Sequence, residues 1–151
     1  MEFEFFMPMD PPTATAQERQ VRIIRGKPIF YEPTSVKSAR AILISSLRDH
    51  KPEEPIMGPI QLNVWWRFPR GKSHKDMEWR ITKPDTDNLQ KLLKDCMTAV
   101  GFWKDDAQVC SETVGKVWVD SLPGIAVGIY TLPLKVHDPE EGDEYDTERT
   151  D

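Results

Sequence analysis

The chain has 151 residues and a formal net charge of −5, which argues against a simple DNA-binding protein. The charge is unevenly distributed, because residues 138–151 hold eight acidic side chains and one arginine. Removing these from the totals of 25 acidic and 20 basic residues leaves 17 and 19, so the rest of the chain is mildly basic. We therefore predict a single folded domain over residues 1–135 and an acidic, disordered tail over residues 136–151.

Composition also excludes several classes of protein. No apolar run approaches the roughly 18 residues of a membrane span. Acidic residues stand near the N-terminus, where a signal peptide carries basic ones. Cys96 and Cys110 form no CxxC or Cys/His zinc pattern. We expect a cytoplasmic protein with no membrane partner, in which both cysteines are reduced and lie in or near the core.

The first third of the chain predicts strands, a turn and a helix. Residues 3–7 are short and aromatic and predict an opening strand, which the following prolines end. Residues 25–27 predict a turn, and residues 28–31 a short extended segment. Helical spacing of apolar side chains predicts a helix that runs to about Arg48, with Ser35 or Thr34 as its N-cap. The stripe of that helix consists of Val36, Ala39, Leu43 and Leu47.

The remaining elements predict an α+β fold. Residues 60–66 alternate apolar and polar side chains, which is typical of a half-buried strand. Residues 109–119 and 125–132 have the composition of strands, and the turn signal between them favours a hairpin. Together with a second helix described next, these elements predict one small domain with a mixed β-sheet and two main helices.

Residues 83–106 organise the rest of the chain. Their middle part predicts an amphipathic helix, with Thr86 or Asp87 as its N-cap and Gly101 at its end. The apolar stripe at three- and four-residue steps would face the core. That stripe consists of Leu89, Leu92, Leu93, Cys96, Met97 and Val100.

One pair of carboxylates stands at each end of this helix. Asp85 and Asp87 lie at its start, and Asp105 and Asp106 follow its end, roughly 20 Å away along a straight axis. A strand or loop returning past the helix start would bring the pairs together. Mg²⁺ prefers oxygen ligands from one or two carboxylates, with water and substrate phosphate completing its shell. The arrangement therefore suits a divalent metal site for phosphodiester hydrolysis.

Each of these residues also has a purely structural interpretation. Taken alone, Asp85 and Asp87 could be capping residues. Lys91 lies one turn beyond Asp87, where it could orient a phosphate or only form a solvated i,i+4 pair. Asn88 and Gln108 could orient metal ligands or stabilise turns. Trp103, by contrast, is predicted to be a core residue.

The segment before the acidic helix is the most basic part of the chain. We predict a mobile loop that leads directly to Asp85 and contacts DNA phosphates, which position a duplex without reading its sequence. The predicted DNA-binding residues are Arg67, Arg70, Lys72, Lys75, Arg80 and Lys83. A second, weaker basic patch consists of Arg19, Arg22, Arg25 and Lys27.

Two sequence blocks resemble one known family. Residues 85–91 read Asp-Thr-Asp-Asn-Leu-Gln-Lys, and residues 101–109 read Gly-Phe-Trp-Lys-Asp-Asp-Ala-Gln-Val. Their order and spacing resemble the RusA-type Holliday junction resolvases, whose pattern is Asp-x-Asp-Asn-Leu-x-Lys, an apolar helix, and Gly-x-Trp-x-Asp-Asp-x-Gln-Val. Thr86 departs from the residues that are frequent in relatives, and we expect substitutions there to be tolerated. The resemblance covers most of residues 3–132, with a looser match outside the two blocks.

The resemblance implies a fold, an activity and a site. It implies a RusA-like nuclease domain over residues 1–135 that acts as a homodimer of phage or bacterial origin. Each subunit would nick one of two opposed strands of a four-way DNA junction during recombination and repair. The implied catalytic residues are Asp85, Asp87, Asp106 and Lys91, of which the three aspartates would bind Mg²⁺, with Mn²⁺ as a substitute. Asp105 is the less favoured member of its pair.

Two other functions stay open at this point. One is a non-catalytic module that binds branched DNA, which the intact acidic set disfavours. The other is a Mg²⁺-dependent hydrolase of small nucleotides. The basic loop and the lack of a glycine-rich phosphate cradle disfavour that function.

Overall fold

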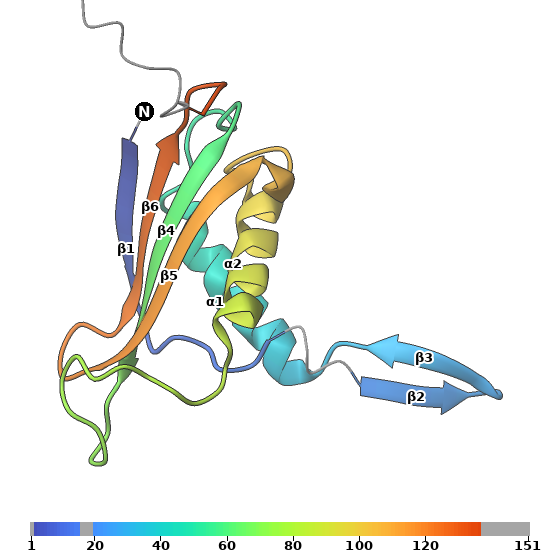
Figure 1. Ribbon diagram of the computed structural model, residues 1–151. Coiled ribbons are helices and arrows are strands. Elements are labelled where there is room, and N and C mark those ends of the chain that lie inside the picture. The colour runs from blue at the N-terminus through green and yellow to red at the C-terminus, as the bar shows by residue number, and fades with distance from the viewer. Residues whose placement is uncertain (1, 16–19, 137–151) are drawn as a thin grey trace, which may run out of the picture.

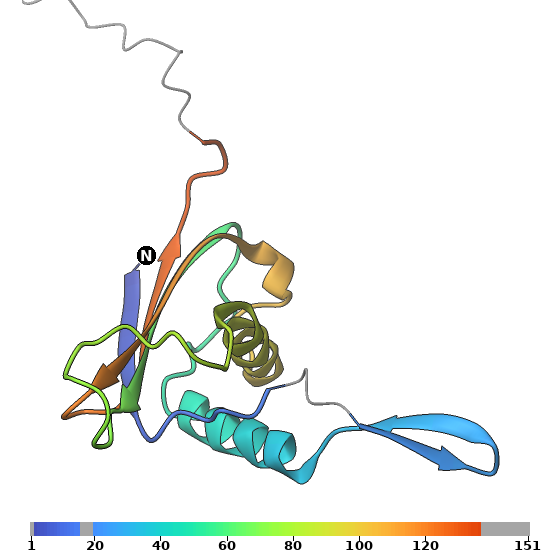
Figure 2. The same ribbon diagram turned by 60° about the horizontal axis from the view of Figure 1, so that its bottom comes forward.

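In the computed structural model, residues 2–15 and 20–136 are described. A four-stranded sheet carries two α-helices on one face, and a separate two-stranded sheet projects from the domain (Figures 1 and 2). This confirms the predicted α+β fold with a mixed sheet and two main helices. In chain order the elements are β1 (Glu2–Pro8), β2 (Gln20–Ile24), β3 (Lys27–Tyr31), α1 (Thr34–Arg48), β4 (Ile60–Pro69), α2 (Thr86–Val100), the 3₁₀ helix η2 (Asp106–Gln108), β5 (Val109–Val119) and β6 (Gly124–Thr131).

Two further sequence-based predictions concern the acidic tail and the lack of a membrane span. The predicted tail, residues 136–151, falls outside the described residues except for Val136, so it stays a prediction. Among the described residues, no helix is both long and apolar enough to cross a bilayer.

The strand order of the main sheet is β1-β6-β4-β5, with β4 in the interior. β4 pairs parallel with β5 and antiparallel with β6, and β1 pairs antiparallel with β6. The predicted hairpin of residues 109–132 is therefore wrong, because β5 and β6 flank β4 instead of pairing. A parallel pair needs a long crossover connection, and α2 supplies it between β4 and β5. The β5–β6 connection passes the end of β4, where the Arg67 guanidinium donates to the carbonyl oxygens of Ser121 (3.3 Å) and Leu122 (3.0 Å).

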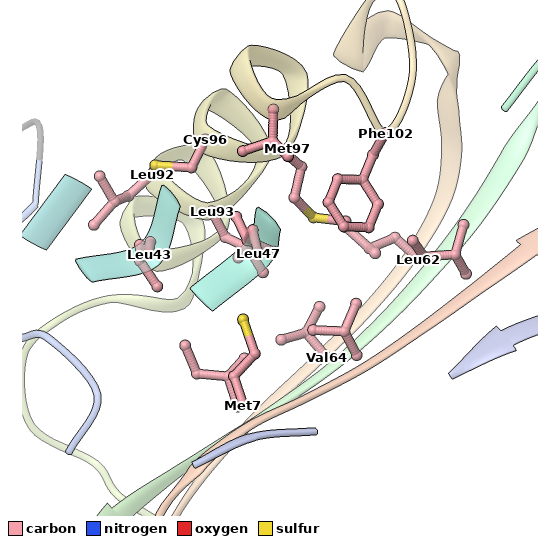
Figure 3. Close-up of a cluster of buried hydrophobic side chains, with 14 of the residues drawn as sticks. Met7, Leu43, Leu47, Leu62, Val64, Leu92, Leu93, Cys96, Met97 and Phe102 are labelled. Carbon is pink, nitrogen blue, oxygen red and sulfur yellow. The ribbon is translucent and has the colours of Figure 1, made fainter. Parts of the chain in front are cut away.

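The core lies between the helices and one face of the sheet. Alternate residues of β4 are buried, from Ile60 to Phe68, and they meet the apolar stripes of α1 and α2 (Figure 3). Full burial of a leucine or methionine side chain contributes about 1.5–3 kcal/mol, so the α2 stripe fastens this helix to the sheet. Trp103 is 1% exposed, which confirms it as a core residue.

The two cysteines differ in environment. Cys96 is buried under α1, as predicted, and burial raises the pKa of its thiol to about 11. Cys110 is exposed, so its predicted place in or near the core is wrong. The reason is that residues 110–113, at the start of β5, are all exposed. Both are free thiols.

The two-stranded sheet β2–β3 forms an arm that extends away from the domain (Figures 1 and 2). Its turn contains Arg25 and Gly26, both with positive φ (51° and 75°), as a tight hairpin turn requires. The predicted turn and extended segment are confirmed, whereas pairing with residues 20–24 was not foreseen. Of the second basic patch, Arg19 lies outside the described residues and the other three lie on this arm. Large apolar side chains are exposed on it: Val21, Ile23, Ile24, Ile29 and Phe30.

Candidate active site

The N-terminus of α2 presents two exposed carboxylates. Asp85 occupies the N-cap position in an extended conformation (φ −70°, ψ 150°), and Asp87 lies in the first turn. The predicted cap at Thr86 or Asp87 is wrong, because the chain is already helical at Thr86. The Asp85 side chain makes no capping hydrogen bond. Its oxygens are therefore available to a ligand from outside the chain.

Lys91 lies one turn further along the same helix. Its side chain is 59% exposed, and its nearest carboxylate is that of Asp95, at 4.0 Å. Lys91 therefore pairs with Asp95 in the structure and not with Asp87. An exposed i,i+4 pair at this distance contributes a few tenths of a kcal/mol at most. The ammonium group is consequently able to turn toward a substrate phosphate.

The C-terminal end of α2 is built differently. Gly101 ends the helix in the left-handed conformation (φ 102°), as predicted. Asp105 caps η2, since its carboxylate accepts a hydrogen bond from the Ala107 N–H (2.9 Å). The Gln108 side chain accepts from the Asp105 N–H (3.2 Å) and donates to the carbonyl oxygen of Ile56 (3.0 Å). Gln108 thus stabilises turns, and Asp105 has a structural role, which agrees with its lower rank as a ligand.

Asp106 is half-buried at the start of η2, at the opposite end of α2 from Asp85 and Asp87 (Figure 1). A helix of 15 residues is about 22 Å long. Within the described part of one chain, no group of three or more His, Cys, Asp or Glu residues lies close enough to hold a metal ion. The structure therefore brings Asp85 and Asp87 to one end and leaves Asp106 at the other. Because Mg²⁺ needs only one or two carboxylates besides water and phosphate, the first pair fits this ion.

The basic loop before α2 is partly fixed to the sheet. The N–H of Met77 donates to the Trp118 carbonyl (2.7 Å), and the Trp118 N–H donates to the Glu78 carbonyl (2.8 Å). Residues Trp79 and Val117 form an isolated antiparallel bridge at the free edge of β5. The expectation of a mobile loop thus fails for its second half, because this edge of β5 offers it hydrogen-bond partners.

The six predicted DNA-binding residues divide into two groups. Arg67 donates to the β5–β6 turn, Arg70 forms an ion pair with Asp120, and Arg80 lies over the rings of Phe68 and Trp118. These arginines hold the fold together at the sheet end. The other three predicted DNA-binding residues are exposed lysines, whose side chains form no hydrogen bond or ion pair with any described residue. The unpaired lysines are Lys72, Lys75 and Lys83.

Two polar residues of this region were missed by sequence reasoning. Gln90 is 1% exposed, and its side-chain oxygen accepts a hydrogen bond from the Trp66 indole N–H (2.9 Å) inside the core. Lys116, on β5, donates to the carbonyl oxygens of Thr82 (2.6 Å) and Pro84 (2.7 Å). The period-two pattern of β5 could have indicated Lys116, because it places this residue on the same face as the core-packed Trp118.

Comparison with known proteins gives a consistent result. The sequence pattern of the family described as endodeoxyribonuclease RusA matches residues 10–130. The chain belongs to the RusA family of endodeoxyribonucleases. Its similarity to the crossover junction endodeoxyribonuclease rusA of Lactococcus phage r1t is 28% identity over 123 residues, which cover 80% of this chain and 87% of that protein. It is also 31% identical to the uncharacterized protein YqaN of Bacillus subtilis (strain 168) over 115 residues, which cover 68% of this chain and 80% of that protein.

The match to the RusA family therefore extends well beyond the two acidic blocks, residues 85–91 and 101–109. The matched range begins just after β1 and includes both helices, the basic loop and most of β6. The family resemblance that residues 85–109 indicated is confirmed.

Proposed function

We propose that this RusA-family enzyme is a Mg²⁺-dependent, structure-selective endonuclease that resolves Holliday junctions by paired symmetric nicks. Its setting would be DNA recombination and repair in the cytoplasm of a bacterial or phage-infected cell. The observation that carries the proposal is the pair of exposed carboxylates at the start of α2, with Asp85 making no capping hydrogen bond. The printed name of the phage r1t relative supports the substrate.

The residues at this helix end suit phosphodiester hydrolysis. Asp85 and Asp87 would hold a Mg²⁺ ion, which supplies a Lewis acid and an activated water when bound. The free peptide N–H groups at the helix N-terminus favour a phosphate oxygen nearby. Lys91 would stabilise the charge that develops on the phosphate. The unpaired lysines Lys72, Lys75 and Lys83 would hold the DNA backbone around the site.

A homodimer would explain the position of Asp106. Two copies of α2 packed antiparallel about a two-fold axis would bring Asp106 of the partner subunit to the helix end that carries Asp85 and Asp87. The same operation creates a second, identical site. Two symmetric sites match the two-fold symmetry of a four-way junction that is nicked on opposed strands.

The first experiment is cleavage of a synthetic mobile four-way junction, with linear duplex as the control substrate. Wild type and Asp87→Asn are each tested with Mg²⁺ and with EDTA. We expect paired nicks on the junction alone, absent in the variant and in EDTA. Tight junction binding without nicking would instead support the non-catalytic module. Hydrolysis of nucleoside triphosphates by protein that leaves the junction intact would support the small-nucleotide hydrolase.

A mixing experiment tests the shared site. Asp85→Asn and Asp106→Asn proteins are unfolded together and refolded, so that half of the dimers contain one copy of each. If each site draws Asp106 from the partner subunit, a mixed dimer has one intact site and makes single nicks. A mixture of Asp85→Asn with Asp87→Asn is the matched control and stays inactive, because both changes lie at the same end. Equal inactivity of the two mixtures would exclude the shared site.

A further inference from the structure

The segment that carries the chain from the sheet to Asp85 is held by two cations. The backbone N–H of Arg80 donates to the Lys116 carbonyl (3.1 Å), which ends the pairing with β5. The three carbonyl groups just before Asp85 then accept hydrogen bonds from side chains rather than from the backbone. Lys116 Nζ donates to Thr82 (2.6 Å) and Pro84 (2.7 Å), and Arg80 Nη2 donates to Lys83 (2.5 Å).

Arg80 is fixed in place by its surroundings. Its guanidinium carbon lies 4.2 Å from the centre of the Phe68 ring and 4.4 Å from that of Trp118. Its Nε is buried without a hydrogen-bond partner among the described residues, and burial lowers the pKa of the side chain. An arginine packed over two aromatic rings is not a freely moving phosphate contact. One of its Nη2 donors is directed at the Lys83 carbonyl.

Lys116 is likewise held in place, by the hydrogen bonds that its ammonium donates to Thr82 and Pro84. Burial, and next the charge of Arg80, lower the pKa of its ammonium, whereas the Asp85 carboxylate raises it. The positive charges of Arg80 and Lys116 repel each other, which costs free energy in the folded state. The Asp85 carboxylate offsets part of this cost. Lys116 comes from the second half of β5, so its donors tie the segment to a strand that pairs with β4 along its whole length.

We propose that Arg80 and Lys116 form a clamp of positioning residues, which fixes residues 82–84 and thereby sets the place of the Asp85 carboxylate for metal binding. Groups that orient a metal ligand typically contribute 10- to 100-fold to metal affinity or activity. The clamp rests on the proposed function only in treating Asp85 as a metal ligand. It also assigns Arg80 a role different from direct DNA binding.

The test compares Lys116→Met with wild type, because methionine keeps most of the aliphatic stem and removes the donors. The matched control is Lys94→Met. Lys94 is similarly buried and joins α2 to β5 through an ion pair with Glu112 (2.9 Å), but it forms no hydrogen bond with the described segment before Asp85. Mn²⁺ binding to the protein without DNA is measured by electron paramagnetic resonance. The Mg²⁺ concentration for half-maximal junction cleavage and the melting temperature are measured in parallel.

We expect Lys116→Met to weaken Mn²⁺ binding about 10-fold. The Mg²⁺ requirement should rise by the same factor, and saturating Mg²⁺ should restore most of the cleavage rate. Lys94→Met should change neither metal measurement. The proposal would be contradicted if Lys116→Met lowered the melting temperature but kept the metal affinity and the Mg²⁺ requirement within about twofold of wild type. Lys116 would then only stabilise the fold. If Lys116→Met does not fold, Lys116→Leu, which also removes the donors, is judged by the same criteria.

Failure of the clamp and failure of the proposed function have different signatures. Wild type that binds Mn²⁺ through Asp85 but nicks no junction contradicts the function and leaves the clamp intact. Wild type that nicks junctions while Lys116→Met keeps normal metal affinity contradicts the clamp alone.

Discussion

Asp85 and Asp105 both stand at a helix N-cap position, but only the Asp105 carboxylate forms a capping hydrogen bond. Each is the extended residue before a helix, Asp85 before α2 and Asp105 before η2. The Asp105 carboxylate accepts a hydrogen bond from the Ala107 N–H, and the Gln108 side chain accepts one from the Asp105 N–H, which completes a capping box. The Asp85 carboxylate bonds to no backbone group of its helix. An aspartate at a helix start therefore indicates function only when the local backbone leaves it unused.

The two ends also differ in what supports them. At the Asp105 end, neighbouring residues supply the hydrogen bonds, and Gln108 reaches Ile56 and Gly58. At the Asp85 end, support comes from β5 and the basic loop. Both ends are thus tied to distant parts of the chain, but only at the Asp105 end does the carboxylate itself bond to the local backbone, whereas at the Asp85 end the cations Arg80 and Lys116 hold the carbonyl groups that precede it.

The largest effect should follow from Asp85→Asn. Asparagine is as good an N-cap as aspartate, so the free energy of unfolding should change by less than about 0.5 kcal/mol. Loss of one metal-binding carboxylate should lower the junction cleavage rate on the order of 10³-fold, since metal catalysis contributes several kcal/mol. The rate is measured in single-turnover assays, with urea denaturation alongside. Cleavage within tenfold of wild type would show that Asp85 is a structural residue like Asp105.

Lys91→Met should have the next largest effect. Removal of one group that stabilises transition-state charge typically costs about 10²-fold in rate. Stability should hardly change, because Lys91 is largely exposed and its ion pair with Asp95 is long. Junction affinity, measured by gel shift, should stay within about threefold of wild type. A loss of affinity as large as the loss of rate would assign Lys91 to DNA binding instead.

Asp105→Ala tests the other side of the comparison. Loss of a capping carboxylate should reduce the free energy of unfolding by about 1 kcal/mol. Urea denaturation measures this change, and Asp105→Asn, which can still cap, is the matched control. Cleavage should stay within about threefold of wild type for both variants. A large loss of activity in Asp105→Asn with unchanged stability would make Asp105 a functional residue.

The smallest effect is expected at Thr86, which lies between the two carboxylates. Thr86 is half-buried, and its side chain forms no hydrogen bond with any residue that the structure describes. Thr86→Val keeps its shape and removes the hydroxyl group. Both stability and cleavage should stay within about 0.5 kcal/mol and twofold of wild type. A loss beyond tenfold in cleavage would show that the hydroxyl group takes part in the site.

Local periodicity accounts for what could be predicted from the sequence. The alternation in β4 and the apolar stripes of α1 and α2 are patterns within single segments, and the structure confirms them. The end of α2 was predictable because Gly101 readily adopts the left-handed conformation. The family-specific blocks likewise lie within one continuous stretch of 25 residues.

Choices between distant partners could not be predicted in the same way. The composition of β5 and β6 suits a hairpin, but β4 offers each of them a long strand edge, and that competition is not visible in either segment. The clamp was missed for a related reason, because Lys116 and Thr82 are 34 positions apart in sequence. Only the parallel register of β5 brings them into contact.

The sheet topology also has a consequence for synthesis on the ribosome. Among the described residues β1 pairs only with β6, so the first strand to be synthesised has no strand partner until the last one is made. About 120 residues separate them, and at about 5–20 residues per second this delay lasts roughly 6–24 s. During that time Phe3 and Phe5, which pack against the finished core, have no strand partner. Nascent chains that stall before residue 124 therefore expose an aromatic strand, and we expect chaperones and quality-control proteases to act on them.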